Sequence, residues 1–87
     1  MNLSDKETSM GEKLKQIMAD VLSVSVSEIN DKSSMQNIRD WDSIKHMELI
    51  FSIEEQFDIQ KLGMDAIASM TSVAEIKRVL KKSGVEI

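Results

Sequence analysis

Three residues near the middle of the chain, Asp42, Ser43 and His46, are the residue types of a hydrolytic triad. Ser43 and His46 are three positions apart, so in a helix they would lie on one face. A serine nucleophile also needs a base within about 2.6–3.2 Å, a group that orients this base, and an oxyanion site. Because the first turn of an exposed helix encloses none of these, we expect no catalysis and interpret His46 as a solvated helix residue.

Two further patterns of acidic residues predict no catalytic or metal site. Glu54 and Glu55 are adjacent, and adjacent helix positions point about 100° apart, so their carboxylates do not converge on one atom. The segment 31–34 begins like a calcium-binding loop but lacks the later Asp, Asn and Gly residues. The chain has no Cys and one His, so we expect neither a metal centre nor thiol chemistry of its own.

Composition narrows the possible partners and compartments. The chain has 87 residues, which fits one small domain, and its net charge of −4 argues against nucleic-acid binding. No stretch reaches the roughly 18 apolar residues of a membrane span. Residues 1–9 are polar and lack the apolar core of a secretion signal, so we expect a cytoplasmic protein.

Apolar spacing predicts the first element, a helix over about residues 9–22. Ser9 and Glu12 have the spacing of a capping box in front of it. We expect residues 1–8 to form a flexible N-terminus and residues 9–87 to form a single domain.

The segment 23–41 lacks helical periodicity and is rich in Ser, Asn and Asp, which favour loops. It also carries apolar residues that a solvated loop does not need, namely Val24, Val26, Ile29, Met35 and Ile38. We therefore expect a long loop pinned onto the core, with one short turn starting at Ser25 and Glu28.

The strongest helical pattern covers 43–57, with Asp42 in the position of an N-cap. The segment 64–70 predicts a short helix, and Ser72 and Glu75 precede the last helix with capping-box spacing. Because β-branched residues never alternate over a useful run, no sheet is expected. The predicted fold class is all-α: three main helices plus a short third one, with a long loop between the first two.

Charge is distributed unevenly over these helices. Between positions 42 and 58 the chain has five acidic residues and one basic residue, Lys45. The last helix is the reverse, since its charged residues include Lys77, Arg78, Lys81 and Lys82. Such a dipolar surface favours electrostatic steering toward basic partners.

The run from Trp41 to Ile50, continued from Ile53 to Ile59, resembles the acyl carrier proteins. It combines Asp-Ser at a helix start, an apolar residue, Glu-Leu, and a closing Glu-Glu-x-Phe inside an acidic chain of this length. The resemblance covers most of the chain. It implies a four-helix carrier domain over 9–87 that has no catalytic activity of its own.

The resemblance also implies that Ser43 bears 4′-phosphopantetheine, transferred from coenzyme A by a phosphopantetheinyl transferase. The thiol of this arm would carry acyl groups as thioesters between enzymes of a fatty-acid, polyketide or other specialised pathway. Asp42 would help the transferase recognise the serine, for example through the enzyme's metal ion. A serine at a helix N-terminus suits this role, because the helix end favours an attached anion.

Acyl-activating and acyl-transferring enzymes are the further partners that the resemblance implies, acting on a monomer. Their basic and apolar patches would dock on partner-facing residues, which we expect to be Ile44, Lys45, Met47, Glu48, Glu54 and Glu55. Leu49, Ile50, Phe51 and Phe57 would mostly line the bundle.

Some residues depart from the common pattern of fatty-acid carriers. Trp41 replaces a small residue, Lys45 replaces an acid, and Ile44 replaces the commoner Leu. The sequence is more similar to free-standing carriers of specialised pathways, and it names neither the acyl group nor the cognate enzymes. Two alternatives stay open: an aminoacyl or peptidyl carrier, and a helical interaction module that is never modified.

Overall fold

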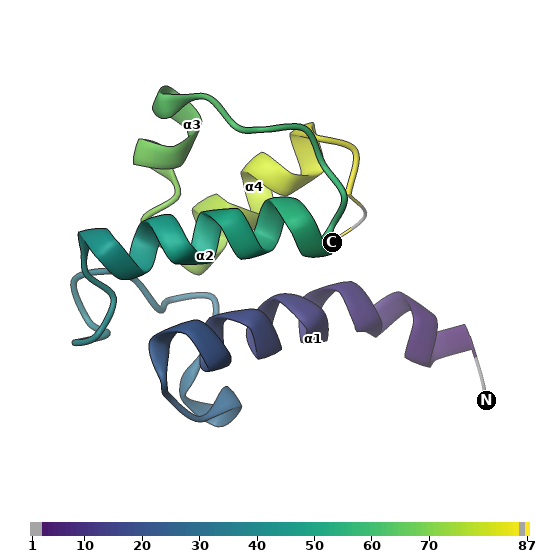
Figure 1. Cartoon of the computed structure of the whole chain (residues 1–87). Helices are drawn as coiled ribbons and strands as arrows, with labels where there is room; N and C mark the ends of the chain where they lie inside the picture. Colours follow the sequence, from purple (N-terminus) through teal and green to yellow (C-terminus); the bar gives the residue numbers. More distant parts are fainter. Residues whose placement is uncertain (1–2, 86) are drawn as a thin grey trace.

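A computed structural model describes residues 3–85 and residue 87 of the chain. Over these residues it contains four α-helices: α1 (Leu3–Leu22), α2 (Ser43–Gln56), α3 (Met64–Ser69) and α4 (Val73–Lys82) (Figure 1). The described residues form no strand, and their one isolated β-bridge joins Ser34 to Ser72. The predicted all-α fold class is confirmed, including the short third helix and the long loop between the first two.

Helix α1 is longer than the apolar spacing predicts. It begins at Leu3 rather than at residue 9, so the expected capping box of Ser9 and Glu12 is wrong, because both residues lie inside the helix. Lys and Glu in the segment 3–9 are good helix formers, and nothing in that sequence stops the helix. Residues 1 and 2 lie outside the described residues, and the flexibility of residues 1–8 stays a prediction.

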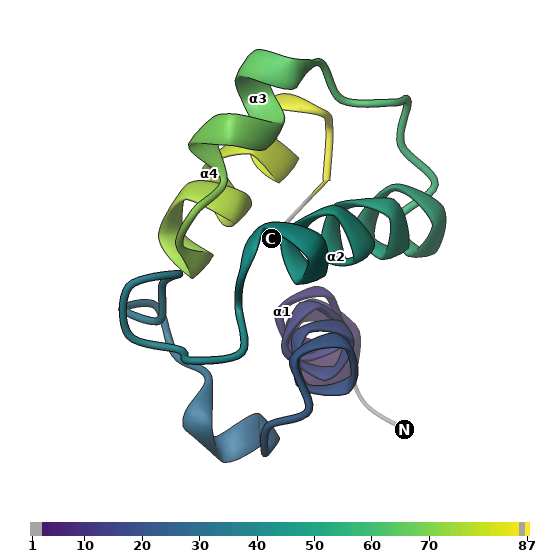
Figure 2. The same cartoon turned by 60° about the vertical axis from the view of Figure 1, so that its left-hand side comes forward.

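The hydrophobic core lies where α1, α2 and α4 meet. Helices α1 and α2 lie side by side and run in opposite directions (Figures 1 and 2). Side chains from every helix except α3 are fully buried there, and each contributes about 1.5–3 kcal/mol through removal of apolar surface from water. The largest of these helical side chains are Leu14, Met18, Leu22, Leu49, Ile50, Ile53, Ile76, Leu80 and Val73, and Trp41 and Met70, which lie just outside the helices, are fully buried as well.

The long loop is pinned to the core, as predicted. Ile29 and Ile38 are buried, and a short 3-10 turn (Val26–Glu28) forms where Ser25 donates its backbone N–H to Glu28 Oε2. The loop also reaches the start of α4, where the Val73 N–H donates to the Ser33 carbonyl across 2.9 Å. This second bond holds the loop against the start of α4.

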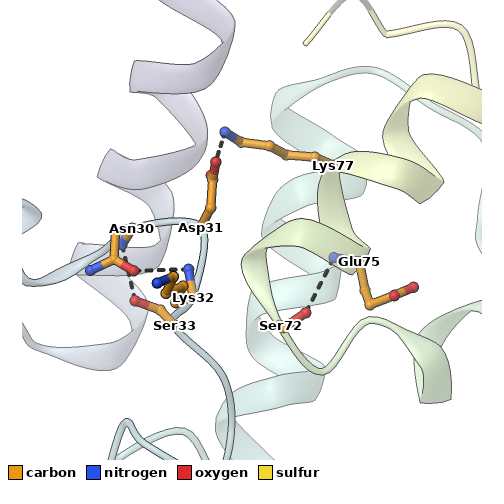
Figure 3. Close-up of polar contacts among 7 residues, drawn as sticks. All are labelled: Asn30, Asp31, Lys32, Ser33, Ser72, Glu75 and Lys77. Carbon is orange, nitrogen blue, oxygen red and sulfur yellow. Dashed lines mark hydrogen bonds and ion pairs between the residues drawn. The ribbon is translucent and has the colours of Figure 1, made fainter.

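An ion pair joins the loop to α4, and a side-chain cap begins that helix (Figure 3). Lys77 Nζ lies 2.8 Å from Asp31 Oδ1, and this hydrogen bond and charge hold the pKa of the Asp31 carboxyl below its ordinary value of 3.8. Ser72 Oγ accepts the Glu75 N–H at 3.2 Å, which confirms Ser72 as the predicted N-cap of α4.

Candidate functional site

The N-terminus of α2 is built by Asp42, whose backbone is extended and whose side chain caps the helix. Asp42 Oδ1 accepts the Lys45 N–H at 2.9 Å, and the Asp42 carbonyl accepts the His46 N–H at 2.8 Å. Ser43 is the first helical residue and is exposed. The structure therefore presents the Ser43 hydroxyl to solvent at a helix end where backbone N–H groups and the helix dipole favour an anion.

His46 is buried, which corrects the sequence-based interpretation of a solvated residue. Only 7% of its surface is exposed, and both ring nitrogens have partners. Trp41 Nε1–H donates to His46 Nδ1 at 3.0 Å, and His46 Nε2 lies 2.8 Å from the carbonyl oxygen of Ile67 at the end of α3. The sequence pattern missed this because the partners come from a loop and from a helix 21 positions away along the chain.

These two contacts fix the chemistry of the imidazole. The indole N–H can only donate, so Nδ1 must accept; the carbonyl can only accept, so Nε2 must carry the proton. His46 is therefore neutral, and its acceptor nitrogen is bonded to Trp41 rather than to Ser43. A base that is occupied in this way cannot activate the serine, which agrees with the expected absence of hydrolysis.

An apolar stripe runs along the exposed side of α2. Ile44 is 71% exposed and Phe51 is 57% exposed, and their spacing of seven places them on one face, with Met47 half-buried between them. The expectation that Phe51 lines the bundle is wrong. More than half of its surface is exposed, whereas Leu49 and Ile50 are buried as expected.

The charged residues expected to face partners fall into two groups. Glu48 and Glu55 are exposed, and Lys45, which is half-buried, forms an ion pair of 3.7 Å with Glu48. Glu54 is half-buried, and its Oε2 accepts the Leu62 N–H at 2.8 Å. Glu54 is therefore engaged with the connection between α2 and α3, unlike its neighbour.

The fold and this helix start define a class of protein. Residues 12–80 match the family described as "Phosphopantetheine attachment site". The chain is also 36% identical, over 70 residues, to an acyl carrier protein of Clostridium acetobutylicum; the match covers 80% of this chain and 90% of that protein. The chain belongs to the acyl carrier protein family.

Membership of this family defines the general activity. The protein is a carrier and not a catalyst, and its domain is the kind to which phosphopantetheine is covalently attached. Members of the family work with a transferase and with biosynthetic enzymes.

In the described part of the chain, no three His, Cys, Asp or Glu side chains are grouped to hold a metal ion. No helix among those residues has the length and apolarity to cross a bilayer.

Proposed function

We propose that Ser43 is the residue of this acyl carrier protein to which 4′-phosphopantetheine is attached. The observation that carries the proposal is the exposed Ser43 hydroxyl at the first position of α2, directly after the capping Asp42. The site fits the group: a phosphodiester on Ser43 would gain about 0.3–1 kcal/mol from the helix end, and an arm attached there can extend into solvent.

The attachment reaction transfers phosphopantetheine from coenzyme A to the Ser43 oxygen. The Ser43 oxygen loses its proton and forms a bond to the phosphorus of the pantetheine side of coenzyme A. The diphosphate P–O bond breaks, and adenosine 3′,5′-bisphosphate leaves. Because the His46 acceptor nitrogen is bonded to Trp41, His46 does not supply the base, and we assign that role to the transferase. Asp42 directly precedes Ser43 and is exposed, so a cation on the enzyme can contact its carboxylate.

We also propose a docking surface for the partner enzymes along α2, formed by Ile44, Met47, Phe51, Glu48 and Glu55. The exposed Ile44 and Phe51 offer apolar contact, and Glu48 and Glu55, each four positions after one of them, lie beside that stripe. A partner with a basic rim around an apolar patch would match this surface, and its approach would be steered by the acidic charge. Lys45 sits at its edge, paired with Glu48, and limits the local negative charge.

Intact-mass measurement tests the attachment site. The chain is co-expressed with a broad-specificity phosphopantetheinyl transferase, and we expect a mass gain of one phosphopantetheine. S43A is expected to abolish the gain, whereas S27A, which changes another exposed serine, keeps it. A gain that survives S43A would contradict the assignment. If the wild-type chain is never modified, in cells or in vitro, the unmodified interaction module is favoured instead.

The cargo needs its own experiment. We propose an acyl group of a specialised pathway as the cargo, with an aminoacyl or peptidyl load as the alternative, in a monomeric cytoplasmic carrier. The phosphopantetheinylated protein is offered to adenylating enzymes for fatty acids and for amino acids, and the loaded thioester is weighed. Preferential amino-acid loading would favour the alternative, and sedimentation of the same sample reports the oligomeric state.

A further inference from the structure

The His46 imidazole takes no part in the attachment chemistry, yet it is one of the two buried polar side chains among residues 10–85. It lies one helical turn after Ser43 and contacts two segments that are far apart in the sequence. A buried polar group held by two hydrogen bonds fixes the positions of its partners, because leaving either partner unpaired is costly.

The Trp41–His46 hydrogen bond closes a ring around the attachment serine. Residues 42–45 lie inside this ring, and Trp41 is only 2% exposed, so the ring is anchored in the core. Within it, the Asp42 carbonyl accepts the His46 N–H at 2.8 Å. The backbone that carries Ser43 is thus bonded to the core on both sides, by Trp41 before it and His46 after it.

The second bond of His46 extends this anchoring to α3. The helix has six residues, too few to be stable by itself in water. Its Ile67 carbonyl accepts the Met70 N–H at 3.2 Å and also meets His46 Nε2. The end of α3 is therefore tied to the first turn of α2, as the two elements are placed in Figure 1.

We propose that His46 is a positioning residue for the modification of Ser43. Its neutral imidazole holds Trp41, and through it the start of α2, so that Ser43 meets the transferase with its backbone already ordered. This inference rests on the proposed attachment site. Losing the Trp41–His46 bond leaves the backbone to be ordered during binding, so the KM of the transferase for this protein rises while kcat is little changed.

Two substitutions of His46 each keep one of its two hydrogen bonds and remove the other. The Asn amide oxygen stands as many bonds from Cβ as His Nδ1, so H46N keeps an acceptor for Trp41. The Gln amide nitrogen stands as many bonds from Cβ as His Nε2, so H46Q keeps a donor for Ile67. W41F removes the indole N–H together with part of the buried ring, so I76V, a smaller side chain in the core of α4, serves as the control for general loss of stability.

The experiment measures transferase kinetics with coenzyme A on each variant, beside its melting temperature. We expect H46Q and W41F to raise KM, lowering kcat/KM by up to about tenfold, with H46N and I76V near wild type. Amide exchange at positions 45 and 46 should quicken in H46Q while that of Leu49 stays slow. Wild-type kcat/KM in H46Q and W41F, or losses matched by I76V at equal stability, would overturn the proposal. Failure of the attachment assignment differs, because the wild-type chain itself would then stay unmodified.

Discussion

Lys13 of α1 donates a hydrogen bond from its ammonium to the carbonyl oxygen of Gln56, the last residue of α2, across 2.6 Å. The same ammonium lies 5.3 Å from the centroid of the Phe57 ring. The last carbonyls of a helix lack partners within the helix, and the negative end of the helix dipole favours a cation there. One side chain therefore joins α1 to the far end of the helix that begins at Ser43.

K13M tests this contact. It keeps most of the apolar stem and removes the charge, so we expect the free energy of unfolding to fall by about 1 kcal/mol, or roughly 5 °C in melting temperature. Urea unfolding followed by the fluorescence of Trp41 gives the measurement. K61M, which removes an exposed cation from the α2–α3 connection, is the control and should change stability by less than half as much. Equal effects of both variants would contradict the helix-end contact.

The Asp31–Lys77 ion pair makes one part of the stability depend on pH. Because the folded state lowers the pKa of the Asp31 carboxyl, the pair stabilises the protein above the ordinary value of 3.8, and this contribution is lost as the pH falls through the folded-state pKa. Asp31 is exposed, so we expect D31N to cost only about 0.2–1 kcal/mol at pH 7.

The D31N effect should also shrink in 1 M salt and disappear in acid, since both conditions weaken the ion pair. Unfolding free energies of wild type and D31N, measured from pH 7 downward, give the check. D40N removes another exposed carboxylate of the same loop and is the matched control. A D31N deficit that grows as the pH falls would be inconsistent with a lowered pKa.

Two glycines should respond to alanine in opposite directions. Gly11 lies inside α1, and a Cβ there would meet no atom within 4 Å, so G11A should stabilise the protein by roughly 0.5–1 kcal/mol. Gly84 follows α4 with φ of 95°, a conformation that side chains rarely adopt, so G84A should destabilise it by about 1 kcal/mol. Thermal unfolding of both variants decides the matter, and stabilisation by G84A would contradict the observed turn.

Much of this fold could be predicted because local signals agree with it. The caps Asp42 and Ser72 precede their helices, and the loop residues Ile29 and Ile38 are buried as their apolar character indicates. The predicted start of α1 at residue 9 was wrong because Ser9 and Glu12 give only a local capping signal. Such a signal does not end a helix whose preceding residues also favour helix.

In the candidate site too, residues set by local signals could be predicted, and residues set by distant contacts could not. Asp42, Ser43 and Ile44 could be placed because a helix start fixes their exposure. His46 could not be placed, because its burial depends on an indole from the loop and on a carbonyl of α3. The predicted burial of Phe51 was wrong for a related reason. A broad apolar face does not tell which edge of the helix the neighbouring helices leave uncovered.

Glu54 and Glu55 are neighbours in the sequence, but the structure gives them different tasks. Glu54 accepts the Leu62 N–H at 2.8 Å in a half-buried position, so E54A leaves that donor without its partner and should cost about 1 kcal/mol of stability. E54Q keeps an oxygen acceptor and should lose less. Glu55 is exposed, so E55A should leave the melting temperature unchanged within about 2 °C.

For the rate of association with the transferase, we expect the reverse order: substitutions of Glu55 should matter more than substitutions of Glu54. E55A, and E55K more strongly, should slow association with a basic partner several-fold at low salt, and the difference should fade as salt screens the charge. E54Q removes the same formal charge from a side chain already engaged within the protein, so its effect on association should be smaller. Stopped-flow association rates at two salt concentrations measure both. If E54Q slows association as much as E55A, the bonded carboxylate also faces the partner, and the division between the two residues is wrong.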